Sequence, residues 1–529
     1  MKGFYQKASS VLEEILKKDF HKELEPPLWE LPPKQEFGDF SSMVALKLAS
    51  KLKKDPLEIA VQLKSSLEKL LSPDVEKVDI LRPGFINVFV SRKALIQSLN
   101  ELLKSRDRFF RQQLKKRVLL EFVSANPTGP LSIAHGRQAL VGDVIGRILE
   151  FFGNTVEREY YVNDEGRQIE LLVESVQARI KEVRGEEFHF PEDGYRAAYV
   201  KDIAQKFFQE KRKNVKRFTL SHTLSLIKRD LRRLNIQFDN WVSQGKLIQD
   251  GKVKDAIALL KKKGHIYEKE GACWFSSTHF GDDKDRVIQK GAGSFTYFAS
   301  DIAYHREKIK REFDELINLW GPDHHGYIER VIASIEAFGF SREILKIIII
   351  QLVSIKTKER MSRRKGTAVL LSDLIDEVGK DAVRFYYLTR RNSSHLEFDI
   401  DLAQEASFNN PLYYVQYACA RIESIFRKAK KKSLPSHSEF LQSEDEINLL
   451  RLLLQFSYSL EKAYYSLEPV FIIEYLKSLA AYFHKFYERR RVLGEAQNVM
   501  CARLNLLKAT KVVLGCGLTL LGIKPLKRM

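Results

Sequence analysis

The sequence predicts a multidomain α/β protein built around a doubly wound parallel sheet of the Rossmann type. A short apolar strand, 118–123, runs through a loop rich in Asn, Pro and Gly into a helix that begins near His135. The segments 317–320 and 347–353 are almost continuously apolar, which is typical of strands buried on both faces. A chain of 529 residues exceeds one ordinary hydrophobic core, so about three domains are expected.

The first predicted domain, residues 1–112, is a small α+β unit. Apolar residues at helical spacing indicate helices. Two strand-like segments, 78–80 and 85–90, are separated by Pro83-Gly84 and predict a hairpin. The basic segment 106–117 is expected to be a linker.

The sheet domain is predicted to span residues 113–404. Its first helix should stop at Gly153-Asn154, and the β-branched and aromatic segment 155–162 should be the next strand. A long charged stretch, about residues 170–290, is predicted to be a helical insertion in this domain. Residues 405–529 show aromatic and leucine residues at helical spacing and predict an all-α domain.

Charge and cysteine content narrow the class of protein. The formal net charge is +19, from 88 basic and 69 acidic residues, which suits a polyanionic partner such as nucleic acid, although a merely lysine-rich composition remains an alternative. The four cysteines lie far apart, so neither a disulfide framework nor a structural zinc is expected. The N-terminus lacks the apolar core of a signal peptide, and no stretch reaches about 18 apolar residues. We therefore expect a cytoplasmic location and no membrane association.

The loop before the first helix of the sheet domain is a candidate phosphate-binding site. Ser132 and His135 are hydrogen-bonding residues three positions apart at a loop–helix junction, where backbone N–H groups favour anions. Both side chains could face one phosphate chain. Alternatively, Ser132 only caps the helix.

A second candidate follows the strand that ends near residue 353. Residues 356–367 are dense in cations, and such a loop can stabilise charge that develops during phosphoryl or nucleotidyl transfer. A solvated basic turn is the alternative. The basic run 427–432, between two helices of the last domain, has the same two interpretations, a solvated loop or an RNA surface.

In order, spacing and sheet context, these two motifs resemble the paired signatures of class I aminoacyl-tRNA synthetases. The neighbouring residues resemble the arginyl-tRNA synthetases in particular, over essentially the whole chain. The segments that carry the resemblance are 37–40, 82–87, 121–130, 158–164, 297–304, 320–326 and 410–421.

The sequence departs from the class signatures in two places. The first signature, His-Ile-Gly-His, reads Ser132-Ile133-Ala134-His135 here. The second signature, Lys-Met-Ser-Lys-Ser, reads Arg360-Met361-Ser362-Arg363-Arg364. Serine still donates a hydrogen bond but carries no imidazole, and arginine presents a planar fork in place of a point charge.

The resemblance implies a two-step reaction without a covalent enzyme intermediate. The carboxylate of arginine attacks the α-phosphate of ATP, pyrophosphate leaves, and the arginyl group passes from the adenylate to the 3′-terminal adenosine of tRNA. It also implies Mg²⁺ with the ATP, a tRNA requirement for the first step, a tRNA-contacting N-terminal domain, an anticodon-binding helical domain and a monomer.

The resemblance also assigns site residues. Arginine recognition requires carboxylates within planar, bidentate reach of a guanidinium. Asp301 and Tyr297 match that position of the family, although from sequence alone they would be an ordinary helix start. The implied catalytic residues are Ser132, His135, Arg360, Met361, Ser362, Arg363 and Arg364. The implied ATP-binding residues are Pro130, Ser132, Ile133, Ala134, His135 and Lys365. The implied arginine-binding residues are Glu121, Ser124, Asn126, Tyr297, Asp301, Asp323 and His324.

Two other functions fit parts of the sequence. A different nucleotidyl transferase of the same sheet type would need neither the large helical domain nor the +19 charge. A tRNA-binding relative without catalytic activity is favoured only by Ser132 and Ala134. Four intact residues speak against it: Asn126, His135, Tyr297 and Asp301.

Overall fold

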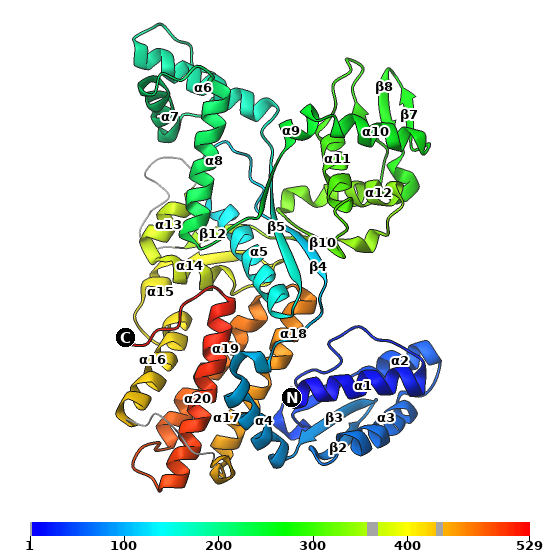
Figure 1. Ribbon diagram of the computed structural model, residues 1–529, viewed down its shortest axis with the longest axis vertical. Coiled ribbons are helices and arrows are strands. Elements are labelled where there is room, and N and C mark those ends of the chain that lie inside the picture. Colours follow the sequence, from blue (N-terminus) through cyan, green and yellow to red (C-terminus); the bar gives the residue numbers. More distant parts are fainter. Residues whose placement is uncertain (1–2, 357–368, 430–436) are drawn as a thin grey trace. The chain divides into compact units, whose positions relative to one another are not determined.

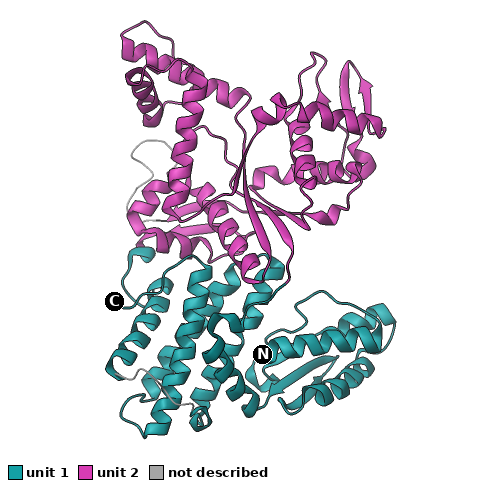
Figure 2. Ribbon diagram, viewed as in Figure 1, with its two compact units in different colours: residues 1–113, 402–529 teal, residues 114–401 magenta. Residues whose placement is uncertain are grey.

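The computed structural model describes residues 3–356, 369–429 and 437–529 (Figure 1). Residues 360–365 of the second signature and Lys430, Lys431 and Lys432 of the basic run lie outside the described residues. The chain forms two compact units (Figure 2). Unit 1 combines residues 1–113 with 402–529, and unit 2 comprises residues 114–401.

The centre of unit 2 is a five-stranded sheet with the strand order β11-β10-β4-β5-β6, in which every pairing is parallel. The bounds are β4 (Arg117–Glu121), β5 (Thr155–Val162), β6 (Asn240–Ser243), β10 (Glu315–Trp320) and β11 (Leu345–Ile349). From β4 the chain extends the sheet to one side through β5 and β6, and later to the other side through β10 and β11. The predicted doubly wound parallel sheet is therefore confirmed.

Helices cover the sheet because its central strands are apolar on both faces. The helix α5 (Ile133–Phe151) contacts β4, β5 and β10, and an added Cβ on its Gly142 would lie 2.3 Å from the ring of Phe122. A separate core unites Leu119 and Leu316 with residues of three further helices. These are α10 (Lys252–Lys262), α11 (Tyr297–Ile309) and α12 (Ile328–Phe338).

Two predicted strands differ from the structure. The first strand ends at Glu121, because Val123 and Ser124 adopt positive φ angles of 69° and 39° and turn the chain out of the sheet. The predicted strand 347–353 is wrong: β11 ends at Ile349, and Val353 begins a different strand. Because β11 is an edge strand, its isoleucines are only half-buried and its apolar run does not report burial on both faces.

The predicted helical insertion is continuously helical in character only as far as Arg233, and strands occur among the helices after it. It contains α6 (Arg167–Arg184), α7 (Ala198–Gln209) and α8 (Val215–Arg233). The chain then supplies β6 to the central sheet, followed by α9 (Gln244–Gln249), α10 and an antiparallel sheet. This second sheet consists of β7 (Ile266–Lys269), β8 (Ala272–Phe275) and β9 (Arg286–Gln289). These strands are only four residues long, too short to show a periodic pattern.

Unit 2 ends with a small parallel pair of strands and its helices. The pair is β12 (Val353–Lys356) with β13 (Leu396–Asp399), accompanied by α13 (Leu371–Val378) and α14 (Lys380–Tyr387). The fully buried Arg137 of α5 donates to the carbonyl oxygens of Gln351, Arg391 and Ser394 at 2.7–2.9 Å. The first helix of the sheet domain therefore holds the backbone that leads into both short strands.

Unit 1 contains a three-stranded antiparallel sheet in the order β1-β3-β2 and a group of long helices. The predicted hairpin is present as β2 (Val75–Leu81) and β3 (Phe85–Val90). The other bounds are β1 (Phe40–Ser42), α1 (Phe4–Phe20), α2 (Val44–Leu52), α3 (Pro56–Leu71) and α4 (Arg92–Ser105). The C-terminal helices are α15 (Ile400–Gln404), which straddles the boundary, α16 (Pro411–Ala429), α17 (Glu444–Leu454), α18 (Phe456–Ser466), α19 (Val470–Arg489) and α20 (Gln497–Leu520).

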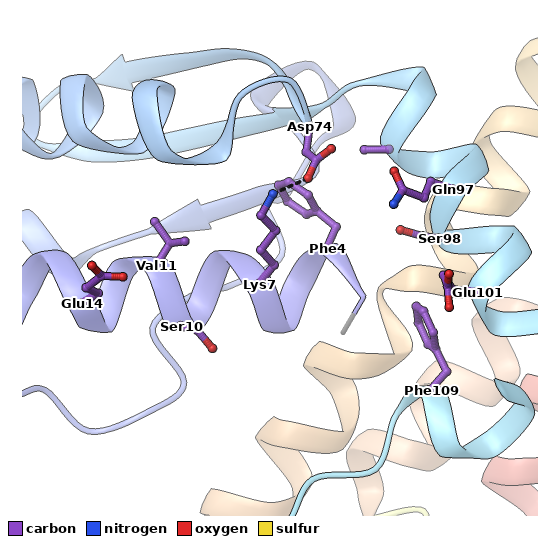
Figure 3. Close-up of a pocket in the computed structure, with 11 residues that line it drawn as sticks. Phe4, Lys7, Ser10, Val11, Glu14, Asp74, Gln97, Ser98, Glu101 and Phe109 are labelled. Atoms are coloured by element: carbon purple, nitrogen blue, oxygen red, sulfur yellow. Dashed lines mark hydrogen bonds and ion pairs between the residues drawn. The ribbon is translucent and has the colours of Figure 1, made fainter. Parts of the chain in front are cut away.

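A cavity of about 510 Å³ lies among the N-terminal elements of unit 1 (Figure 3). Lys7 Nζ on α1 contacts Asp74 Oδ2 at 2.6 Å, and Glu101 on α4 belongs to the same lining. None of the residues predicted for chemistry lines this cavity. Among the described helices, none is long and apolar enough to cross a membrane. The four cysteines are free thiols.

Candidate active site

The loop that follows β4 brings the first two site residues together. Glu121 ends the strand, and the left-handed turn at Val123 and Ser124 directs the Ser124 hydroxyl back to Glu121 Oε1 at 2.9 Å. A positive φ is unfavourable for a β-branched residue such as Val123, by about 1–3 kcal/mol. The same hydroxyl accepts the backbone N–H of Tyr161 on β5, at 3.1 Å. The strained turn thus fixes the Glu121 carboxylate relative to two strands.

The next residues lie where the loop meets α5. Ser132 is the N-cap of the helix, and its backbone N–H donates to Nδ1 of His135 at 3.2 Å. Because Nδ1 accepts this hydrogen bond, a neutral ring carries its proton on Nε2. Burial lowers the pKa of His135, so the neutral form predominates at neutral pH, with the Asp323 carboxylate opposing the shift. The ring can therefore donate one hydrogen bond to an anion without bringing a charge.

The helix α11 supplies Tyr297 and Asp301, one turn apart. Tyr297 is 54% exposed. Its hydroxyl packs closely against Gly166, where an added Cβ would lie 2.0 Å from the hydroxyl oxygen. Gly166 has φ 91° and is the N-cap of α6. Asp301 lies deeper, and within the described part of the chain no hydrogen-bond donor contacts its carboxylate. Burial, followed by the neighbouring Glu121 carboxylate, raises the pKa of Asp301 to about 7, while Lys308 and Arg330 oppose the shift.

One cavity of about 500 Å³ collects these residues at the carboxyl edge of β4, β5 and β10. The reversal of strand order in this sheet lies between β4 and β10, which is where ligands bind in open α/β sheets. The lining includes all seven residues predicted for arginine, namely Glu121, Ser124, Asn126, Tyr297, Asp301, Asp323 and His324, together with His135.

The predicted residues differ in how deeply they lie. Glu121 is buried, whereas the side chains of Asp323 and His324 are 78% and 53% exposed and belong to the mouth of the cavity. Asn126 Nδ2 donates to Gln168 Oε1 at 2.7 Å, so its amide is already oriented by α6. Four of the residues predicted to bind ATP are not part of the cavity lining: Pro130, Ser132, Ile133 and Ala134.

The second signature, including Arg360, Met361, Ser362, Arg363, Arg364 and Lys365, lies outside the described residues, but both ends of its segment are described. It follows β12 directly. After it, Val369 and Leu371 exchange backbone hydrogen bonds with Ile133 and Leu131 at 3.2 and 2.9 Å. The backbone of the first signature thus pairs with residues that directly follow the second.

The structure adds site residues that the sequence did not single out. They are Tyr161 and Tyr304, whose rings stack at 4.3 Å, together with His305, Lys308 and Asn318. One signal was available in the sequence. Tyr297, Asp301, Tyr304 and Lys308 recur at helical spacing and lie along one face of the helix.

Comparisons with known proteins agree with this geometry. The family model described as "tRNA synthetases class I (R), catalytic domain" matches residues 98–398. The models described as "Arginyl tRNA synthetase N terminal domain" and "DALR anticodon binding domain" match residues 6–90 and 415–529. The protein is thus a class I aminoacyl-tRNA synthetase of three domains, with a parallel-sheet domain, an N-terminal domain and a helical C-terminal domain.

Individual relatives specify the amino acid. The chain is 40% identical to the arginine–tRNA ligase of Bacillus licheniformis over 98% of both chains. It is 41% identical to that of Listeria monocytogenes over 95% of this chain and 94% of the relative. The arginyl-tRNA synthetase of Thermus thermophilus shares the fold with a TM-score of 0.82 at 22% identity, over 99% of this chain and all of that one. The chain belongs to the arginyl-tRNA synthetase family, and it is a ligase that charges tRNA with arginine for protein synthesis.

Proposed function

We propose that the 500 Å³ cavity of unit 2 is where arginine is activated, by attack of its carboxylate on the α-phosphate of ATP. The observation that carries the proposal is the gathering of the Glu121 and Asp301 carboxylates and the neutral His135 ring in one cavity at the switch point of the sheet. In this arrangement Asp301 and Tyr297 bind the guanidinium. Ser124 and Asn126 bind the α-amino group, while Asp323 and His324 line the mouth.

His135 and Ser132 hold phosphate oxygens of ATP in this proposal. A neutral imidazole that donates through Nε2 stabilises the charge of the pentavalent phosphate without lowering the nucleophilicity of the arginine carboxylate. The backbone of residues 130–134 lines the adenosine side. The cations of the second signature neutralise the leaving pyrophosphate. The described residues on either side of that segment support this, because β12 precedes it and Leu371 after it donates to the Leu131 carbonyl oxygen.

Mg²⁺ accompanies ATP in this proposal and is bound mainly by phosphate oxygens and water. Within the described residues no three His, Cys, Asp or Glu side chains are close enough to hold a metal ion. Mg²⁺ commonly binds nucleotide phosphates while keeping several waters, so a dedicated protein cage is not required. We further propose that the enzyme works as a monomer in the cytoplasm, where ATP and tRNA are found.

Steady-state kinetics of tRNA charging test the assignment. Asp301→Asn is expected to raise the KM for arginine about a hundredfold, because a desolvated carboxylate–guanidinium contact is lost. The KM for ATP should change by less than about threefold. His135→Asn is expected to lower kcat with little change in the KM for arginine. Asp250→Asn, on the exposed end of α9, is the control. An unchanged KM for arginine in Asp301→Asn would reject this cavity as the arginine site.

A further inference from the structure

The buried Lys308 is paired with Glu121, which together with Asp301 supplies the carboxylates of the deep part of the cavity. The Lys308 side chain is 0% exposed, and its Nζ donates to Glu121 Oε2, whose side chain is 5% exposed. The other carboxylate oxygen of Glu121 accepts the Ser124 hydroxyl at 2.9 Å. Both oxygens of Glu121 are therefore bound by the protein itself, in contrast to the carboxylate of Asp301.

A chain of hydrogen bonds fixes this lysine. Asn318 on β10 accepts from Lys308 Nζ through Oδ1 at 2.9 Å, and its Nδ2 lies 3.0 Å from Nε2 of His305. His305 Nδ1 lies 2.8 Å from the backbone oxygen of Asp301. Burial lowers the pKa of His305 to about 3, so the ring is neutral, donates through Nδ1 and accepts at Nε2. This tautomer leaves the Asn318 oxygen facing Lys308 and adds no charge.

The deep part of the cavity carries a net charge of one negative unit when Asp301 is ionised. Glu121 and Lys308 cancel, and ionised Asp301 remains as one negative charge. Tyr161 and Tyr304 stay neutral because burial raises the pKa of each phenol. Arg330, whose guanidinium lies over the Tyr327 ring, also acts on Asp301 and opposes the rise of its pKa. The other charged residues of the lining are paired or exposed: Glu165 pairs with Lys216, Arg167 pairs with Glu174, and Asp323 is exposed.

We propose that Lys308 is a positioning residue that holds Glu121 and cancels its charge, so that the cavity presents one unpaired negative charge and selects a side chain with one positive charge. This inference rests on the proposed function of the cavity as the arginine site. Without the lysine, two carboxylates would share a desolvated cavity, and like charges there compete for a proton with the substrate. Without Glu121, the buried ammonium would repel the guanidinium.

The test compares arginine with citrulline, in which a carbonyl oxygen replaces one guanidinium nitrogen and leaves a neutral side chain of the same length. The preference is the inhibition constant of citrulline divided by the KM of arginine, measured in tRNA charging with the full-length enzyme. Four proteins are compared: the unmodified chain, Glu121→Gln, Lys308→Met and the double variant. Their deep cavities carry formal charges of about −1, 0, −2 and −1 with Asp301 ionised.

Glu121→Gln is expected to lower the preference about tenfold, since the cavity then attracts a cation and a neutral group similarly. The double variant should return to within about threefold of the unmodified chain, because it restores the single negative charge. Lys308→Met should raise the KM for arginine about tenfold at pH 7, while the KM for ATP stays within about threefold. A merely structural role would not move the preference between two amino acids of equal shape.

The inference is overturned if the double variant discriminates no better than Glu121→Gln, or if Lys308→Met changes the KM values for arginine and ATP equally. Should Lys308→Met fail to fold, the comparison of Glu121→Gln with the double variant decides alone, since the double variant contains no unpaired charge from this pair. Asp301→Asn separates this inference from the proposed function. An unchanged KM for arginine in that variant rejects the arginine site, whereas a raised KM without recovery in the double variant rejects only the role of Lys308.

Discussion

The Ser132 hydroxyl lies 3.1 Å from Nδ1 of His135, the same nitrogen that accepts the Ser132 backbone N–H. The residue that replaces the first histidine of the class signature therefore contacts the second one. Ser132 both caps α5 and sets the tautomer of the His135 ring, so the two interpretations of this residue in the sequence, cap and site residue, are compatible.

Ser132→Ala keeps the backbone contact and removes the hydroxyl. We expect kcat/KM for ATP to fall about tenfold, the value of one hydrogen bond. His135→Ala removes the donor itself and should cost about a hundred- to a thousandfold in kcat. Charging kinetics at saturating arginine measure both. Equal losses in the two variants would contradict this order, and an unaffected Ser132→Ala would exclude the hydroxyl from the site.

Asp301 predicts the pH dependence of arginine binding. A guanidinium binds the ionised carboxylate, and the pKa of this group is about 7 in the free enzyme. The KM for arginine should therefore rise about tenfold per pH unit below pH 7 and level off above pH 8. Arginine binding should also release a proton, which calorimetry in buffers of different ionisation enthalpy detects. A flat KM between pH 6 and pH 8 would contradict this prediction.

The raised pKa of Asp301 also makes the free energy of unfolding depend on pH. The dependence is opposite in sign to that of a salt-bridged aspartate, whose pKa is lowered. The pKa of Asp301 is raised from 3.8, so the folded chain binds the proton more tightly than the unfolded chain does. Its contribution to the free energy of unfolding is fully present below about pH 4 and is lost as the pH rises through about 7. Asn does not titrate, so the Asp301→Asn variant should lack this decrease in the free energy of unfolding between pH 5 and pH 8. Urea unfolding of both proteins across that range checks it.

Gly166→Ala tests Tyr297 without changing it. The added Cβ would lie 2.0 Å from the Tyr297 hydroxyl, at a backbone φ of 91° that alanine rarely adopts. We expect Tyr297 to be displaced and the KM for arginine to rise about tenfold, with a loss of stability of about 1–2 kcal/mol. Gly185→Ala is the matched control, because it has φ 71° at the other end of α6 and nothing within 4 Å. A similar KM in both variants would separate Tyr297 from arginine binding.

The sequence predicted those parts that depend on local patterns. The turn at Gly153-Asn154 and the strand after it follow from the glycine and from the β-branched and aromatic residues of 155–162, and the structure has the same strand bounds. The division of 345–356 into β11 and β12 was not predictable in this way, because the pairing partners of both strands lie far away in the sequence. An apolar run shows that a strand exists without showing which sheet contains it.

The site residues, too, were predictable from the sequence only where a local motif contains them. Asp301 and Tyr297 were found because they belong to a motif, whereas Lys308 was not, because a lysine near the end of a helix is usually solvated. Only the fold shows that Lys308 Nζ points inward to Glu121 and Asn318. Charge compensation between residues 187 positions apart leaves no trace in local composition.

Arg137 predicts how much of the stability of unit 2 depends on one buried side chain. Arg137→Met removes the donors to the Gln351, Arg391 and Ser394 carbonyl oxygens, which precede β12 and β13. We expect the free energy of unfolding to fall by about 3–5 kcal/mol, since buried carbonyl groups lose their donor. Arg167→Met, on the exposed side of α6 with a salt bridge to Glu174, should cost less than about 1 kcal/mol. Urea denaturation of the two variants measures the difference, and equal losses would show that the Arg137 contacts contribute no more than a surface ion pair.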